Sequence, residues 1–252
     1  MKAALLAMAL ASSPADTGAL FALYAQGHYQ DAMHRGEESR SAEDLAIAAR
    51  AALADAMTRP EPCLSCLERA EEDARRAIAL DAHNADGHVW LATSLGYEAR
   101  LQGVMHASWN NSPGQAKEQL DEALAADPNN PYALAALGGW HVELVRVGGA
   151  FLANKVYDAG LEKGMALFDR AVRAAPHNVA VHYQIALSLA GLDVDHYRAR
   201  IESELNAAIE GPPQTAYEKF VAARAQELLT LLKRDDADAF ETKLKTFQGY
   251  PD

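Results

Sequence analysis

One spacing of residues recurs along this chain and restricts it to stacked helices. Small or apolar residues follow one another at intervals of four, three and five, in four copies. The copies are Ala70, Ala74, Ala77 and Ala82; Ala116, Leu120, Ala123 and Pro128; Gly164, Phe168, Ala171 and Pro176; and Ile201, Leu205, Ala208 and Pro213. Intervals of three and four place residues on one helix face. Each copy therefore predicts a helix with a buried face that ends at a corner, where proline stops the helix in three of the four copies.

A second set of positions recurs between these copies and predicts the partner helix of each pair. Its members are His88, Leu91, Ala92 and Leu95; Leu134, Leu137, Gly138 and His141; and His182, Ile185, Ala186 and Leu189, with a weaker match at Leu45, Ala48, Ala49 and Ala52. Small residues at fixed positions let neighbouring helices approach, and larger ones fill the gaps. Asn129 or Asn130, and likewise Asn178, can cap the helix after the corner.

The combined pattern resembles the tetratricopeptide repeat over most of residues 42–226, although Ala82 replaces the closing proline and the first-position Trp is absent. The resemblance implies an all-α, right-handed helical solenoid of about five to six helix-turn-helix repeats. We expect a hairpin over 15–38 and helices over 41–57, 63–80, 84–101, 116–126, 130–145, 161–174, 179–189, 197–209 and 215–233. A last helix over 235–247 would cap the stack.

Two inserts interrupt the regular spacing in the middle of the chain. The paired small residues Ala92 and Ala116 are 24 positions apart, and Gly138 and Gly164 are 26 apart, because residues 102–115 and 146–161 are added. Inserts of this kind collect on one face of a solenoid, often the binding face. Such lengthened hairpins resemble two groups of tetratricopeptide-related proteins, the T-component of periplasmic solute-transport systems and the regulators of microtubule dynamics.

The amino terminus is typical of an exported protein. Lys2 precedes an apolar run over residues 3–10, and Ala9 and Ala11 form a small-x-small cleavage site. We therefore predict a signal peptide over 1–11, a solenoid domain over 12–252, and a periplasmic or secreted location. The alternative is a frayed amphipathic helix of a cytoplasmic protein. No later segment approaches the roughly 20 apolar residues that span a membrane, so we expect no stable membrane insertion.

The composition excludes several classes of function. The net charge of −12 argues against nucleic-acid binding. The nine histidines are scattered without metal-ligand spacing, and nucleotide fingerprints and Ser-His-Asp patterns are absent. We expect no metal, no cofactor and no enzymatic activity.

Cys63 and Cys66 form a CxxC motif at a predicted helix start. A local disulfide is the favoured interpretation, with free thiols or a redox or metal role as alternatives.

First-helix positions that alternate with the packing positions should line the inner groove of the solenoid. Together with apolar and aromatic residues of the inserts, they are the candidate binding residues Asp86, Val89, Thr93, Tyr97, Trp109, Tyr132, Glu143, Phe151, Tyr157 and Tyr183. Trp90 and Trp140 are better explained as core residues. The sequence therefore predicts a non-catalytic scaffold that binds a peptide or protein partner in its concave groove. The alternative is a small hydrophobic ligand in a pocket formed by the inserts, as in a transport-accessory protein. If there is a site, we expect it where the inserts converge beside Tyr132 and Trp140.

Overall fold

The computed structural model describes residues 14–61, 63–103 and 110–250, and within these residues the fold is all-α, as predicted. The helices are α1 (Pro14–Gln26), α2 (Tyr29–Glu38), α3 (Ala42–Thr58), α4 (Leu64–Leu80), α5 (Ala85–Gln102), α7 (Ser112–Ala126), α8 (Pro131–Tyr157), α9 (Leu161–Ala174), α10 (Val179–Leu192), α11 (Val194–Glu210), α12 (Ala216–Lys233) and α13 (Ala237–Gln248). They follow the predicted ranges to within a few residues, except that α8 continues beyond the predicted end at 145 to Tyr157.

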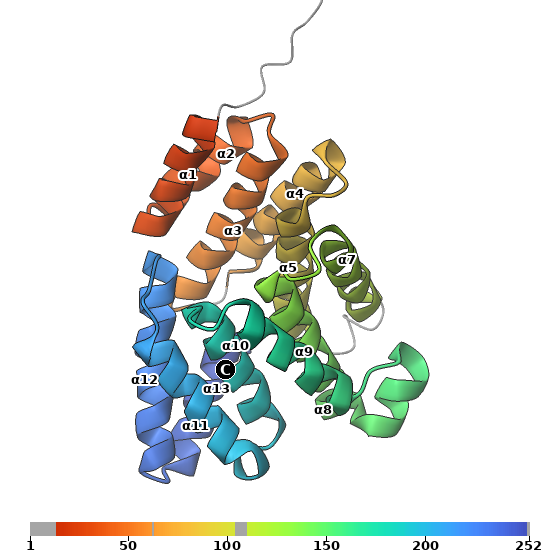
Figure 1. The fold of residues 1–252 in the computed structure, drawn as a ribbon, viewed down its shortest axis with the longest axis vertical. Coiled ribbons are helices and arrows are strands. Elements are labelled where there is room, and N and C mark those ends of the chain that lie inside the picture. Colours follow the sequence, from red (N-terminus) through yellow and green to blue (C-terminus); the bar gives the residue numbers. More distant parts are fainter. Residues whose placement is uncertain (1–13, 62, 104–109, 251–252) are drawn as a thin grey trace, which may run out of the picture.

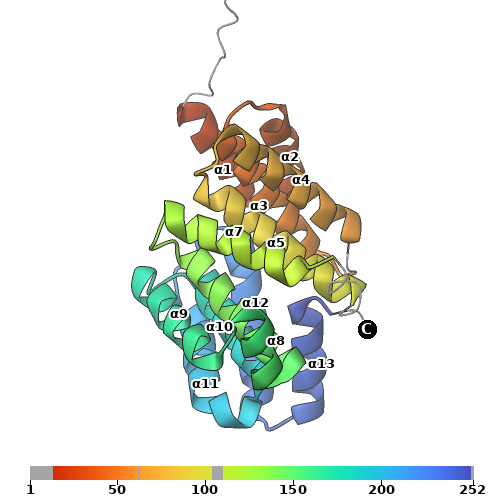
Figure 2. The same cartoon turned by 90° about the vertical axis from the view of Figure 1, so that its right-hand side faces the viewer.

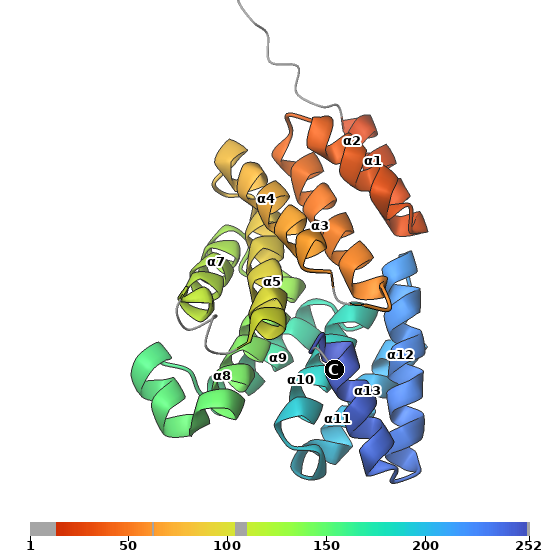
Figure 3. The ribbon, with the colours of Figure 1, turned by 180° about the vertical axis from the view of Figure 1, so that it is seen from behind.

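Helices that follow one another in sequence pack side by side from α1 to α13 (Figure 1). The first helices of successive pairs, α3, α5, α8 and α10, also contact one another and form an inner layer. The stack then closes on itself, because α12 contacts both α1 and α3. The last helix, α13, packs against α10 and brings the C-terminal end to the middle of the molecule (Figure 3). The C-terminal helices thus cover the inner layer in addition to ending the stack.

Three corners between helix pairs have the same hydrogen bonds, so the sequence repeat is also a structural one. In each corner an asparagine side chain accepts a hydrogen bond from a backbone N–H of the next helix. Asn84 accepts from Gly87 at 2.7 Å, Asn130 from Ala133 at 3.0 Å, and Asn178 from Val181 at 3.0 Å. These bonds satisfy amide groups that have no partner within the helix.

Two histidines at the same repeat position connect a corner to the neighbouring helix. His88 Nε2 lies 3.0 Å from the carbonyl oxygen of Ala82, and its Nδ1 lies 2.8 Å from Gln119. His182 Nε2 likewise lies 3.0 Å from the carbonyl oxygen of Pro176, and its Nδ1 lies 2.5 Å from Glu204. Both rings are buried, so these contacts satisfy polar groups that would otherwise be costly inside the stack.

Glycines allow a close contact between α8 and α9. A Cβ atom on Gly138 would lie 2.6 Å from the Phe168 ring, and one on Gly164 would lie 3.0 Å from the carbonyl oxygen of Gly138. Phe168 is fully buried in the space that these glycines leave. The small-large-small pattern therefore has the packing role that the sequence predicts.

The second insert is helical rather than a loop. α8 continues to Tyr157, but Gly149 interrupts it with φ 73° and ψ 156°, a conformation that favours glycine. Residues 150–157 therefore leave the direction of the first part of α8 and project from the body of the molecule (Figure 1). We call this segment the arm. α7 begins at Ser112, four residues before the start predicted at Ala116, so the last part of the first insert is also helical.

Candidate binding site

A cavity of about 640 Å³ lies between α5, α7 and α8. Most of its wall is apolar and includes Leu95, Leu120, Ala136, Trp140, Leu144 and Leu152. α7 contacts both α5 and α8, and the three helices lie next to one another in Figure 2. The cavity exists partly because small residues, among them Ala92, Gly96 and Ala136, face it from the inner helices and leave space that no large side chain fills.

Trp140 connects the two inserts at this cavity. Its Nε1–H donates a 2.8 Å hydrogen bond to the carbonyl oxygen of Pro113, at the start of α7. Its ring makes an edge contact with Tyr157 in the arm, at a centroid distance of 6.1 Å. The interpretation of Trp140 as a core residue is confirmed by its 9% exposure. The ring also forms part of the cavity wall, so core and site overlap at this residue.

One end of the cavity is charged. Arg146 on α8 forms two hydrogen bonds with Glu143, of 2.8 and 2.7 Å, and the hydroxyl of Tyr250 donates to Glu143 at 2.6 Å. Burial alone would raise the pKa of Glu143, but the hydrogen bond from Arg146 and the charge of Arg100 outweigh burial and hold it below its usual value. Glu143 therefore stays a carboxylate. Tyr97 and Gln184 complete this end.

The arm presents an apolar surface beside the cavity. Phe151, Leu152 and Val156 of the arm are 79%, 54% and 57% exposed, and Val147, just before the arm, is 44% exposed. Of these, Leu152 and Val147 also contribute to the cavity wall, whereas Phe151 does not. Single exposed apolar residues need no explanation, but four on one short segment form a patch that suits an interaction.

The predicted groove residues lie in three different environments. Thr93, Tyr97, Glu143 and Tyr157 line the cavity. Val89 and Tyr183 are buried in the core at 1% and 4% exposure, and Asp86 accepts a long hydrogen bond from Asn130 at 3.4 Å. Trp109 lies outside the described residues. The helices α12 and α13 occupy the inner face where an open groove was predicted, and Gly249 packs against Tyr97.

Tyr132 belongs to an aromatic cluster around Arg50, in which Tyr24 and Trp90 are buried. Four rings, those of Phe21, Tyr24, Trp90 and Tyr132, have centroids 4.7 to 5.8 Å from the guanidinium carbon. Arg50 also donates a 3.0 Å hydrogen bond to the Tyr132 hydroxyl. These contacts join α1, α3, α5 and α8, so Tyr132 has a role in packing.

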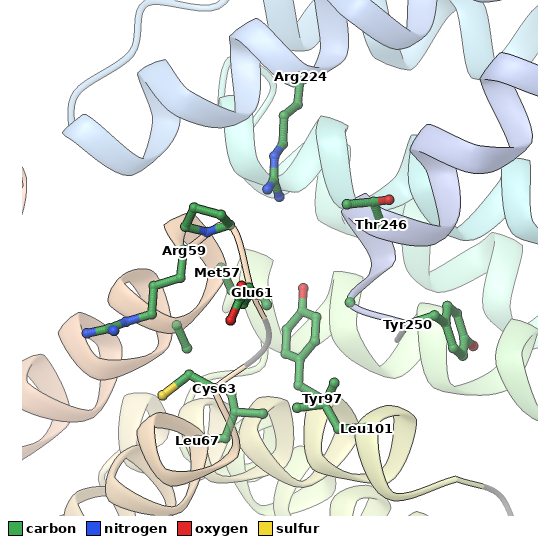
Figure 4. A pocket seen from close by; sticks show the side chains of 13 residues that line it. Met57, Arg59, Glu61, Cys63, Leu67, Tyr97, Leu101, Arg224, Thr246 and Tyr250 are labelled. Atoms are coloured by element: carbon green, nitrogen blue, oxygen red, sulfur yellow. The ribbon is translucent and has the colours of Figure 1, made fainter. Parts of the chain in front are cut away.

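A second, smaller pocket of about 70 Å³ lies behind Tyr97 and Tyr250, which line both spaces. Arg224 of α12 and Tyr97 of α5 point toward one another across it (Figure 4). It is too small for an organic ligand of ordinary size. Cys63 forms one side of this pocket and is joined to Cys66 by a disulfide at the start of α4.

Sequence reasoning did not find four residues of the charged end, Arg100, Arg146, Gln184 and Tyr250. Arg100 follows the last predicted groove position of α5 by three residues, so helix periodicity could have indicated it. Tyr250 lies beyond the last helix, and no local pattern predicts that it returns to α5 and α8.

The matching family model covers residues 23–233 and is described as regulator of microtubule dynamics protein 1-3. The chain belongs to this family. The match spans the inner layer and the cavity, and it agrees with one of the two groups whose lengthened hairpins the sequence resembles. Membership indicates a helical protein-interaction scaffold in general terms. No curated protein matches the chain.

Membership of the regulator of microtubule dynamics family corrects the predicted localisation. Microtubules are structures of the cytoplasm, so the match points away from a periplasmic or secreted protein, and that prediction is wrong. A lysine followed by a short apolar run is common to signal peptides and to amphipathic helices, and residues 1–11 lie outside the described residues. Among the helices that the structure describes, none has the length and apolar character needed to cross a bilayer.

Proposed function

We propose that this chain is a non-catalytic scaffold of tetratricopeptide-like helix pairs that holds an apolar part of a protein partner between α5, α7 and α8. The observation that carries the proposal is the cavity of about 640 Å³ with largely apolar walls, next to an exposed apolar arm. A cavity of this kind accepts a buried anchor side chain, and the arm adds surface for neighbouring side chains of the same partner. The predicted concave groove is a weaker choice, because α12 and α13 cover it.

The chemistry of the wall supports binding without catalysis. The hydroxyl groups of Thr93 and Ser112 and the carboxylate of Glu143 are present, and among the residues that the structure describes no histidine or cysteine contributes to the wall. The carboxylate of Glu143 is engaged by Arg146 and Tyr250, so it is poorly placed as a general base. The site thus offers shape and apolar surface rather than an activated nucleophile.

Filling the cavity tests this proposal. The substitution Ala136→Trp places a large ring in the cavity, whereas Ala223→Trp places the same ring on an exposed position of α12. The neutral apolar dye N-phenyl-1-naphthylamine should bind the wild-type chain and Ala223→Trp, and its affinity for Ala136→Trp should fall by about ten-fold or more, since the apolar contact area is lost. Proteins captured from cytosol by wild type and Ala223→Trp should be missing with Ala136→Trp. Equal dye binding and equal capture by both variants would rule out the cavity as the site.

A second candidate function is supported by the size of the same cavity. Its volume lies within the range of small-molecule pockets, roughly 300 to 1,000 Å³. The second candidate is therefore a carrier of a small hydrophobic ligand. Native mass spectrometry of the purified chain would show a discrete added mass that is absent from Ala136→Trp. A spectrum with only the protein mass, in a preparation that still binds the dye, would favour the protein partner.

A further inference from the structure

The charged end of the cavity contains an arginine without a carboxylate partner. Arg100 donates one hydrogen bond, from Nη1 to the carbonyl oxygen of Gln248 at 3.3 Å. Its guanidinium lies 5.0 Å from the Tyr97 ring centroid and 5.9 Å from that of Tyr250. In the part of the chain that the structure describes, no carboxylate lies within salt-bridge distance of Arg100. A guanidinium has five N–H donors, so most of its capacity is unused by the hydrogen bond to Gln248.

The neighbouring arginine differs in this respect. Arg146 forms a salt bridge with Glu143 at 2.7 Å, which balances its charge within the site. Among the described residues, the cavity wall therefore carries two arginines and one carboxylate, a local excess of positive charge. This excess is unusual in a chain whose net charge is −12. A positive charge beside an apolar wall favours a ligand group that combines apolar atoms with an anion.

Tyr250 already occupies this position with a similar combination of groups. Its ring lies beside Arg100, and its hydroxyl accepts a 2.6 Å hydrogen bond from Arg146 while donating to Glu143. The residue is held by a turn in which Gly249 has φ 80° and the Tyr250 N–H donates to the carbonyl oxygen of Lys245 at 3.1 Å. Tyr250 lies after α13 and is not part of a helix, so its displacement would not disrupt the stack.

We infer that this end is a carboxylate subsite for a peptide segment of the partner, and that Tyr250 occupies the subsite until the partner binds. An apolar side chain of the segment fills the cavity, its carboxylate pairs with Arg100, and Tyr250 moves aside. The segment is a peptide because the apolar surface continues from the cavity onto the arm, where Phe151 and Val156 are exposed. A ligand that contacts both the cavity and the arm needs several apolar groups along an extended chain. The inference rests on the proposed function. It adds that the bound segment of the partner carries a carboxylate.

A competition experiment tests this subsite on the full chain. N-phenyl-1-naphthylamine is first bound to the protein and then displaced by acetyl-Leu-Phe-Leu-Phe, prepared once with a free C-terminal carboxylate and once as the C-terminal amide. The carboxylate peptide should displace the dye at a concentration about ten-fold lower, since the salt bridge with a half-buried arginine contributes to its affinity alone. Tyr250→Phe, which removes the hydroxyl that bridges Glu143 and Arg146, should lower that concentration further.

Two arginine variants identify the residue that selects the carboxylate. Arg100→Gln should make the two peptides equal, and Arg100→Lys should restore part of the difference because it keeps the charge. Arg75→Gln is the matched control, since Arg75 lies on α4 and pairs with Glu71. Dye binding by Arg100→Gln shows that this variant is folded and that its cavity is intact.

Each outcome has a separate meaning. If the dye does not bind wild type, the proposed function fails and the subsite fails with it. If the dye binds but both peptides displace it equally, or neither does, the carboxylate subsite is wrong and the apolar cavity remains. If Arg100→Gln keeps the difference between the peptides, Arg100 is not the selecting residue. Displacement by octanoate but not by the peptide would assign the charged end to a small molecule and overturn the peptide.

Discussion

At the scale of single residues, two acidic groups connect the stability of the fold to pH. Burial, together with the charge of Glu37, raises the pKa of Asp73 to about 7. Burial, together with the nearby carboxylates of Glu71 and Glu68, raises the pKa of Glu98 to about 8. One oxygen of each group is buried without a hydrogen-bond partner. The folded state thus favours the protonated form of both side chains.

When folding raises the pKa of an acidic side chain, proton binding stabilises the folded state. This stabilisation is lost as the pH rises through the folded-state pKa. The melting temperature should therefore increase when pH is lowered from about 9 to about 6, because the folded chain takes up protons on Asp73 and Glu98 that the unfolded chain binds only at lower pH. Glu98→Gln should remove the part of the dependence near pH 8, and Glu122→Gln, at an exposed position, should leave it unchanged. Calorimetry at several pH values measures this. A flat profile for wild type would contradict the burial of these groups.

The residue scale also shows what sequence could predict. The caps at Asn130 and Asn178 were predicted because an asparagine before an amphipathic helix has a clear local role. The pairing of His182 with Glu204 was not, since the two residues are 22 positions apart and only packing brings them together. Tyr250 was missed for the same reason, because its neighbour Arg100 lies far from it in the sequence.

At the scale of helices, close packing of α8 and α9 depends on glycine. Gly138→Ala should lower the free energy of unfolding by about 1–3 kcal/mol, since the added methyl group would overlap the buried ring of Phe168. Gly96→Ala is the matched control within α5: nothing lies within 4 Å of its added Cβ. It should raise stability by about 0.5–1 kcal/mol through the entropy of the unfolded chain. Urea denaturation distinguishes the two, and equal effects would argue against the packing of α8 on α9.

The helices themselves were largely predictable, and the arm was not. Periodic small and large residues predict both the type and the limits of most helices. A glycine pair such as Gly148-Gly149 favours a turn, but only Gly149 leaves the helical conformation, and residues 150–157 resume a helix beyond it. Sequence patterns do not predict such a segment as a helix that projects from the fold, because the apolar side of a helix in a soluble protein usually faces the core. In the arm, apolar side chains face outward.

At the scale of the whole molecule, two buried clusters share several partly buried residues at their boundary, among them Tyr217. Its side chain packs against the cluster that contains Trp90 and Trp140 and also against the one built around Phe168 and α10 to α13. In wild type, tryptophan fluorescence and circular dichroism should follow one unfolding transition in urea. Tyr217→Ala should lower stability by about 2 kcal/mol and separate the two transitions, because the clusters lose a shared contact.

Tyr197→Ala provides the comparison, since Tyr197 on α11 packs against the second cluster only. It should reduce stability while the two transitions remain coincident. If the transitions of Tyr217→Ala also coincide, the clusters are coupled through other residues. The return of α12 to α1 and α3, which creates this coupling, was beyond sequence analysis, because the curvature of a stack sums many small angles between helices.

The contact of α12 with α1 and α3 has a mechanical consequence. In an open stack of helix pairs each repeat contacts only its neighbours, so the curvature of the stack can change at a small cost in free energy. The distance between its inner helices then changes with the curvature. A stack whose last helices press on its first ones has lost that freedom. The separation of α5 from α8 is then a property of the whole ring, so the cavity between them should discriminate between side chains by width as well as by polarity.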